Sequence, residues 1–253
     1  MVEHPVIACY HGPDSSGALQ LGAALAAALG EPLVIAVAYA YEPVALSARA
    51  LPSALDDRRA EAAEHALARA RELVGDPDAR ERIVAAGDVA TALTDLAQEL
   101  DACVLVLGRD LEGHVVRDAI SRATCPVAVS PFSVALPRLQ PLLRVAVADD
   151  GSRPAALAFR AACALVAAAR PGGIPETLTV APGGDAGEEL IAAGERFDLI
   201  VCGSRGRGRL LAAVLGSVSS ALVRGSRCPV LVVPSAVQVS PRGPLGLSTA
   251  ATD

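Results

Sequence analysis

A glycine- and serine-rich stretch after residue 202 carries residue types that can bind an anion. Gly203-Ser-Arg-Gly206 follows an apolar run, and nine residues later Gly216-Ser217-Val218-Ser219 opens another. Glycines let backbone N–H groups approach phosphate oxygens without a Cβ in the way. A helix starting at Ser217 would add unpaired amides and a positive dipole end, and the serine hydroxyls could donate to the same oxygens. The spacing therefore predicts a phosphate-binding loop.

The charge of this stretch favours the same interpretation. Between Gly203 and Cys228 there is no acidic residue, and there are five arginines, at 205, 207, 209, 224 and 227. A solvated glycine-rich turn without any ligand is the alternative. The stretch is not a P-loop, because the Lys-[Ser/Thr] ending is absent, and it lacks the third glycine of a dinucleotide fingerprint.

The elements that must position this loop follow an α/β pattern. Short apolar runs alternate with Ala-rich helical stretches, as in parallel β-α-β units whose sheet is covered on both faces. We expect strands near 6–9, 33–39, 82–85, 103–107, 126–130, 145–149, 177–180, 199–202 and 228–233. We expect helices near 15–29, 55–74, 89–100, 115–122 and 154–170, and another from 217.

Several pieces of the chain occur twice in the same order. Asp101–Gly108 matches Asp198–Gly203, and Cys125–Pro131 matches Cys228–Pro234. Two copies of one domain explain this repeat. We expect domain one at residues 1–132, a linker at 133–141, domain two at 142–235 and a disordered tail at 236–253. Domain two is shorter by one strand and one helix, which predicts five strands in domain one and four in domain two.

Composition excludes several classes of function. Of 253 residues, 52% are hydrophobic and the formal charge is −6, with 11 Arg against 19 acids in 1–141 and 11 against 9 in 142–253. This balance gives no case for nonspecific nucleic-acid binding. We also expect no membrane span, no secretory signal and a cytoplasmic location, and the six cysteines form no CxxC pair.

Other candidate sites are weak. The four histidines, at 4, 11, 65 and 114, accompany no serine-hydrolase elbow and no spaced metal-ligand pair, so we expect no catalytic residues and no metal site. His11 and His114 fall at corresponding loop positions of domain one, where exposed loop histidines are the expectation and a modified pocket is the alternative.

The glycine spacing ahead of a helix and a Cys-Pro-Val-Leu-Val-Val-Pro strand resembles the ATP-binding signature of universal stress proteins. Val145-Ala-Val-Ala-Asp-Asp-Gly-Ser152 likewise resembles the family's opening strand. The resemblance covers about residues 4–234. It implies two doubly wound parallel-sheet domains of the adenine nucleotide alpha hydrolase-like fold, the second shortened.

The resemblance also implies a set of nucleotide-binding residues. Asp150 would lie against the adenosine, with Asp149 and Ala148 beside it, Cys202 lining the pocket, and Val180 able to contact the base if its strand takes the place of the family's second strand. The phosphate and ribose positions would be Gly203, Arg205, Gly206, Gly216, Ser217, Val218 and Ser219. A turn or helix-cap acid is the alternative role for Asp150.

Domain one departs from this pattern. Gly108 is followed by Arg-Asp-Leu-Glu, the loop is eight residues shorter, and His11 stands in place of the aspartate. The nearby acids Asp110, Glu112 and Asp118 would repel phosphate. We therefore expect domain one to be a degenerate copy that binds no nucleotide.

These patterns predict a cytoplasmic, nucleotide-responsive stress or regulatory protein that binds ATP or a related adenine nucleotide in domain two, with Mg²⁺ left open. We expect no enzyme, or at most slow ATP hydrolysis, because no motif places a general base. The resemblance implies that the strands at 125–130 and 228–233 pair the domains as an intramolecular pseudo-dimer, and a homodimer is open. The alternative is a structural interaction module that has lost nucleotide binding.

Overall fold

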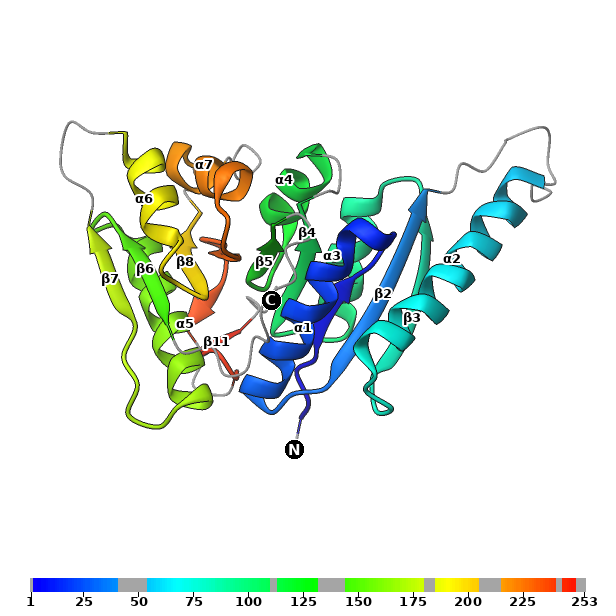
Figure 1. Cartoon of the computed structure of the whole chain (residues 1–253), viewed down its shortest axis with the longest axis horizontal. Helices are drawn as coiled ribbons and strands as arrows, with labels where there is room; N and C mark the ends of the chain where they lie inside the picture. The colour runs from blue at the N-terminus through cyan, green and yellow to red at the C-terminus, as the bar shows by residue number, and fades with distance from the viewer. Residues whose placement is uncertain are drawn as a thin grey trace.

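The computed structural model describes residues 2–40, 54–109, 113–131, 144–179, 185–204, 215–239 and 243–248. Over these residues the chain alternates strands and helices, as Figure 1 shows. The strands are β1 (Val6–Cys9), β2 (Leu33–Ala40), β3 (Arg80–Ala86), β4 (Val104–Gly108), β5 (Val127–Ser130), β6 (Val145–Asp149), β7 (Glu176–Thr179), β8 (Leu199–Gly203), β9 (Val230–Val233), β10 (Gln238–Val239) and β11 (Leu247–Ser248). The helices are α1 (Ser16–Leu29), α2 (Ala54–Val74), α3 (Val89–Glu99), α4 (Gly113–Arg122), α5 (Arg153–Ala169), α6 (Ala186–Gly194) and α7 (Ser217–Gly225), with a short 3-10 turn at Pro13–Ser15.

Nine of the described strands form one sheet in the order β3-β2-β1-β4-β5-β9-β8-β6-β7. Within each half all neighbouring strands are parallel. The expected α/β class, with five strands from domain one and four from domain two, is confirmed.

The helices cover both faces of this sheet, because successive strand residues point to opposite sides. Val104 and Val106 join an apolar cluster with α1, α2 and α5. Leu105 and Leu107 join a second cluster with α3, α4, α6 and α7. The near-continuous apolar strands of the sequence are explained by this burial on two sides.

The two halves meet at β5 and β9, the one antiparallel neighbour pair of the sheet. Val127 pairs with Val232, Ala128 with Leu231, and Val129 with Val230. Val127 and Val230 hold equivalent places in their halves, since they pair with Leu105 and Ile200. The junction is therefore pseudo-symmetric about the Ala128–Leu231 pair, and the expected intramolecular pairing of the two domains is present.

β7 lies beside β6, with Val147 opposite Thr177 and Ala148 opposite Leu178. This is the place that β2 takes beside β1 in domain one. The second half therefore lacks a counterpart of β3 and α2 among its described residues, and β7 forms the edge of the sheet. The shortened second half thus keeps the strand beside β6, and its described residues include no further strand outside β7.

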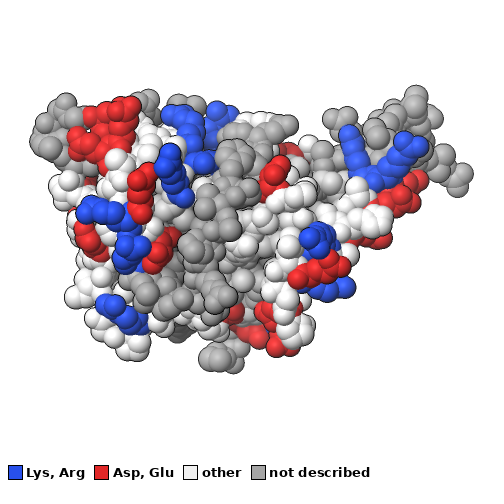
Figure 2. All heavy atoms as spheres, in the orientation of Figure 1, with Lys and Arg blue, Asp and Glu red and all other residues white. Residues whose placement is uncertain are grey.

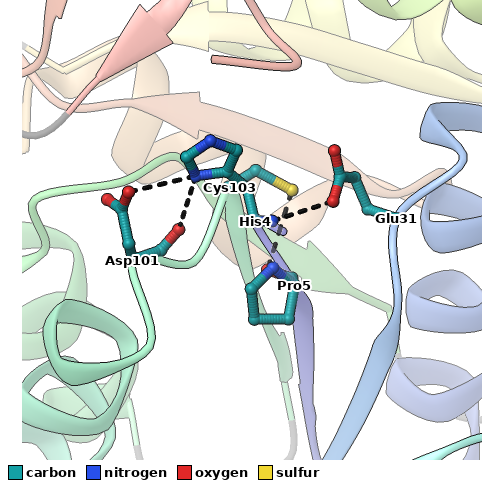
Figure 3. Close-up of polar contacts among 5 residues, drawn as sticks. All are labelled: His4, Pro5, Glu31, Asp101 and Cys103. Atoms are coloured by element: carbon teal, nitrogen blue, oxygen red, sulfur yellow. Dashed lines mark hydrogen bonds and ion pairs between the residues drawn. The ribbon is translucent and has the colours of Figure 1, made fainter. Parts of the chain in front are cut away.

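Polar contacts at the amino ends of the strands fix the start of domain one (Figure 3). The His4 N–H donates to Oε2 of Glu31 at 2.8 Å, and His4 Nδ1 lies 3.1 Å from Oδ2 and 3.2 Å from the carbonyl oxygen of Asp101. The thiol of Cys103 donates to the carbonyl oxygen of Pro5 at 3.6 Å. These contacts tie the segment before β1 to the residues before β2 and β4.

The structure differs from the expected disordered tail at residues 236–239 and 243–248. β10 and β11 pair as an antiparallel hairpin. Val237, Leu245 and Leu247 are buried and join the apolar cluster that holds α1 and α5. The tail differs from the expectation there because its few apolar side chains are buried in this cluster, away from water.

Candidate nucleotide site

A pocket of about 680 Å³ opens at the carboxyl ends of β6, β7 and β8. This edge of a parallel sheet is where ligands bind in open α/β folds. The starts of α5, α6 and α7 form its other walls. The lining residues are Ala148, Asp149, Asp150, Gly151, Ser152, Pro154, Ala155, Leu178, Thr179, Ala186, Leu190, Cys202, Gly203, Gly216, Ser217, Val218 and Ser219.

Three helices begin around this pocket, and their caps differ. The Oγ of Ser152 accepts the Ala155 N–H at the start of α5, and the Oδ1 of Asp185 accepts the N–H groups of Gly187 and Glu188 at the start of α6. The N-cap of α7 is Gly216, which supplies no side-chain hydrogen bond. Among the described residues, α7 is therefore the one of these three helices whose N-cap side chain leaves the first amides to a ligand anion.

The serines of α7 occupy different environments. Ser217 is exposed at the pocket, while Ser219 is buried and its hydroxyl donates to the Gly216 carbonyl oxygen at 3.1 Å. Ser217 is therefore the hydroxyl better placed for a ligand. Ser219 instead holds the turn that presents it.

Gly203 ends β8 where the strand touches the first turn of α5. A Cβ on Gly203 would lie 2.5 Å from the carbonyl carbon and oxygen of Pro154. The next residue, Ser204, donates its N–H to Val233 and accepts the Ser235 N–H on its Oγ. The glycine is thus required for close backbone packing at the floor of the pocket.

Asp149, the last residue of β6, and Asp150 lead into a tight turn. The Oδ1 of Asp149 accepts the Gly151 N–H at 2.8 Å, and the Oδ1 of Asp150 accepts the Ser152 N–H at 3.1 Å. Gly151 has a φ of 73°, which the turn requires and which glycine adopts without strain. Both carboxylates line the pocket while they shape its rim, so Asp150 combines the turn role with the expected pocket position.

One wall of the pocket is apolar. Cys202 is buried, and its burial raises the pKa of the thiol to about 12. It therefore stays protonated near neutral pH and acts as a small apolar side chain. Ala148, Leu178 and Leu190 complete this wall from β6, β7 and α6.

The structure brings together nine of the predicted site residues: Ala148, Asp149, Asp150, Cys202, Gly203, Gly216, Ser217, Val218 and Ser219. Val180, Arg205 and Gly206 lie outside the described residues. The other lining residues were not among the predicted site residues: Gly151, Ser152, Pro154, Ala155, Leu178, Thr179, Ala186 and Leu190. Ala186 could have been found, because Gly183-Gly-Asp185 repeats the Ala86-Gly-Asp88 that precedes α3.

The corresponding edge of domain one is built differently. Tyr10 and His11 follow β1, and Tyr10 is buried, which raises the pKa of its phenol. The Oγ of Ser15 accepts the N–H groups of both His11 and Gly12, at 3.0 and 3.2 Å. The Ser15 hydroxyl therefore accepts two backbone N–H groups at this edge, so these donors are not left for a ligand.

The charges around the pocket are uneven. Figure 2 shows acidic side chains gathered where α6 lies and basic side chains near α7. The acidic first turn of α6 holds Glu188 and Glu189, and the last turn of α7 holds Arg224. Arg224 lies at the end of α7 away from the pocket, so among the described residues an anion at the start of α7 would be held by main-chain amides and the helix dipole.

Two other properties concern the described part of the chain. Its helices include none with the length and apolarity needed to cross a bilayer. Its histidines, cysteines and acids include no group of three or more arranged to hold a metal ion.

Comparison with known proteins gives concordant results. The sequence model of the universal stress protein family matches residues 3–131 and 146–234. A universal stress protein of Mycobacterium tuberculosis is 44% identical over 52 residues, which are 21% of this chain and only 18% of that relative's own length.

A solved structure of similar extent shows the same fold. A universal stress protein from Archaeoglobus fulgidus is similar over 90% of this chain and 95% of its own, with a TM-score of 0.67 and 17% identity. An Archaeoglobus fulgidus universal stress protein solved in complex with dAMP is similar over 53% of this chain and 100% of its own, with a TM-score of 0.40 and 20% identity. Since the family model matches most of the chain in two consecutive segments, this protein belongs to the universal stress protein family, as a member with two such domains in tandem.

Proposed function

We propose that domain two binds an adenine nucleotide, ATP above all, and that the protein acts as a nucleotide-responsive stress or regulatory protein. The observation that carries the proposal is the start of α7 at the pocket, where the N-cap residue Gly216 supplies no side-chain hydrogen bond to the first amides. The pocket volume of about 680 Å³ also lies within the range of about 300–1,000 Å³ that small-molecule sites span.

The pocket offers a different environment for each part of a nucleotide. The apolar wall of Cys202, Leu178 and Ala148 would take the base, and the rim at Asp150 would meet the adenosine. The amides at the start of α7, with Ser217, would take the phosphates. Val180, Arg205 and Gly206 are proposed to join the site on the strength of the family's motif.

Binding without efficient catalysis is the expected chemistry. Among the described residues that line the pocket, Asp149 and Asp150 are the candidates for a general base. One oxygen of each already accepts a main-chain hydrogen bond. ATP hydrolysis should therefore be slow, and the bound nucleotide would act by changing how the protein associates with itself or with a partner.

The test is equilibrium binding of a fluorescent ATP analogue to Gly216→Asp and Gly216→Asn. Gly216 has φ −62° and ψ 162°, which any residue can adopt, and both Asp and Asn are favourable N-caps. Both variants should therefore fold. The aspartate places a negative charge against the phosphates and should weaken binding more than about 10-fold relative to the asparagine.

Equal affinity of the two variants would contradict a phosphate at the start of α7. Mass spectrometry of the protein as purified would show which nucleotide, if any, it retains. No binding by the unaltered protein would favour the structural interaction module that the shortened domain two also allows.

A further inference from the structure

The side chain of Arg109 crosses from domain one to the end of α7 in domain two. Its Nη1 donates to the carbonyl oxygens of Ser226 at 2.6 Å and Arg224 at 3.1 Å. Gly225 is the last residue of α7 and Ser226 is its C-cap. A residue of one domain therefore binds the helix whose other end lines the pocket.

Arg109 occupies a position that the repeat makes easy to identify. Arg109 directly follows β4, and its N–H donates to the Ser130 carbonyl oxygen. Ser204 directly follows β8, and its N–H donates to the Val233 carbonyl oxygen in the same way. In domain two this place holds the small Ser204, at the pocket-side end of β8. In domain one it holds a long cation that reaches into the other domain.

The contact suits the end of a helix. The last carbonyls of a helix have no partners within it and carry the negative end of its dipole. Burial lowers the pKa of Arg109, but an arginine stays charged near neutral pH. The guanidinium thus supplies the cation that stabilises this helix end.

α7 is short and packs tightly against α6. Leu222 is fully buried. On the α6 side, a Cβ on Gly187 would lie 2.6 Å from the Ala221 Cβ, and one on Gly225 would lie 2.7 Å from Ile191. A helix of nine residues is about 14 Å long. A displacement of Arg224 and Ser226 would therefore be transmitted along α7 to Gly216.

We propose that Arg109 is a positioning residue for the nucleotide site, and that through it domain one sets the affinity of domain two. This inference rests on the proposed function, because it assigns a role to Arg109 in the same site. The degenerate domain would then have exchanged a binding loop for a helix anchor. By linkage, nucleotide bound at the start of α7 must also strengthen the Arg109 contact at its end.

The experiment compares Arg109→Met and Arg109→Lys with Arg117→Ala as the matched control. Arg117 is an exposed arginine of domain one that pairs with its neighbour Asp118. Arg109→Met should bind the fluorescent ATP analogue about 5-fold or more weakly, Arg109→Lys should retain part of the affinity, and Arg117→Ala should match the unaltered protein.

Hydrogen exchange separates positioning from general stability. In the unaltered protein, saturating ATP should slow amide exchange at residues 224–226, and in Arg109→Met this slowing should be lost while thermal unfolding is still cooperative. If Arg109→Met does not fold, the same two measurements on Arg109→Lys decide the question. Unchanged affinity and unchanged exchange at α7 in a folded variant would overturn the proposal.

The two proposals fail differently. If the unaltered protein binds no nucleotide, the proposed function falls, and faster exchange at residues 217–220 in Arg109→Met would still show that Arg109 positions α7. If the unaltered protein binds nucleotide and Arg109→Met binds it as well, only the role of Arg109 falls.

Discussion

The backbone of Gly203 passes so close to Pro154 that no side chain fits between β8 and α5. The glycine was predicted as a phosphate residue, because its spacing from Gly206 and Gly216 suggested a loop of exposed amides. The structure gives it a second role, in the packing of the strand against the helix. The two roles are compatible, since close approach of backbones is what glycine permits in both cases.

Gly203→Ala should therefore destabilise the protein even without nucleotide. The new Cβ would lie 2.5 Å from backbone atoms of Pro154, which cannot turn away as a side chain could. Overpacking of this kind costs about 1–3 kcal/mol of unfolding free energy. Urea unfolding of the nucleotide-free protein measures it, and an unchanged midpoint would mean that α5 yields without cost.

The sequence predicted those lining residues of the candidate pocket that belong to recognisable motifs. Asp149, Gly203 and Gly216 were found because turn acids and glycines mark their own positions in the sequence. Pro154 and Leu178 were missed, because they line the pocket only through the packing of α5 and β7 on distant strands. A local sequence pattern cannot predict a contact between elements that are distant in the chain.

The two halves use the same kind of helix cap at equivalent helices. Asp88 accepts the N–H groups of Ala90 and Thr91 at the start of α3, as Asp185 does at the start of α6. The hydrogen bond from the Thr91 hydroxyl is the largest cause that lowers the pKa of Asp88, and the backbone amides add to it. The repeated Gly-Asp dipeptide therefore marks a repeated cap.

The Asp88 cap should make stability depend on pH. A carboxylate with a lowered folded-state pKa contributes stability that is complete above its unfolded pKa of about 3.9 and is lost as pH falls through the folded value. Asp88→Ala should cost about 1 kcal/mol at pH 7 and less at pH 3. Asp88→Asn keeps a cap that does not titrate.

Chemical unfolding of the three proteins at both pH values tests this cap. The free-energy gap between the unaltered protein and Asp88→Ala should narrow on acidification. A gap of the same size at pH 3 would show that the carboxylate charge is not what stabilises α3.

Most elements could be predicted from the sequence, because buried parallel strands read as apolar runs and the helices between them as Ala-rich stretches. The C-terminal hairpin could not. Val237, Leu245 and Leu247 are scattered among Ser, Pro and Gly residues, which is the composition of a disordered tail. Their burial depends on a surface provided by distant helices, and local composition carries no information on it.

At the scale of the whole molecule, the hairpin belongs to the same apolar cluster as α1 of domain one and α5 of domain two. Leu245 is only 2% exposed. Leu245→Ala should lower the unfolding free energy by about 2–4 kcal/mol. Ile174→Ala is the control, because Ile174 is 80% exposed and its truncation should change stability by less than about 0.5 kcal/mol.

Thermal or chemical unfolding measures both variants. A Leu245→Ala protein as stable as its Ile174→Ala control would mean that the hairpin adds nothing to the fold.

The pairing of the halves through β5 and β9 was expected from the resemblance to universal stress proteins, and it satisfies the edge strand of each half. The contact of Arg109 with the end of α7 could not be predicted, because an arginine after a strand is expected to be an exposed surface charge. The contact between Arg109 and α7 therefore depends on how the two halves lie in the common sheet.

The pairing of β5 with β9 inside one polypeptide changes how the double sheet responds to dilution. Two separate chains that met at these strands would part as their concentration fell, by mass action. Here each strand meets its counterpart at an effective concentration on the order of millimolar, set by the connection and not by the number of molecules present. The two-domain form therefore persists at any expression level.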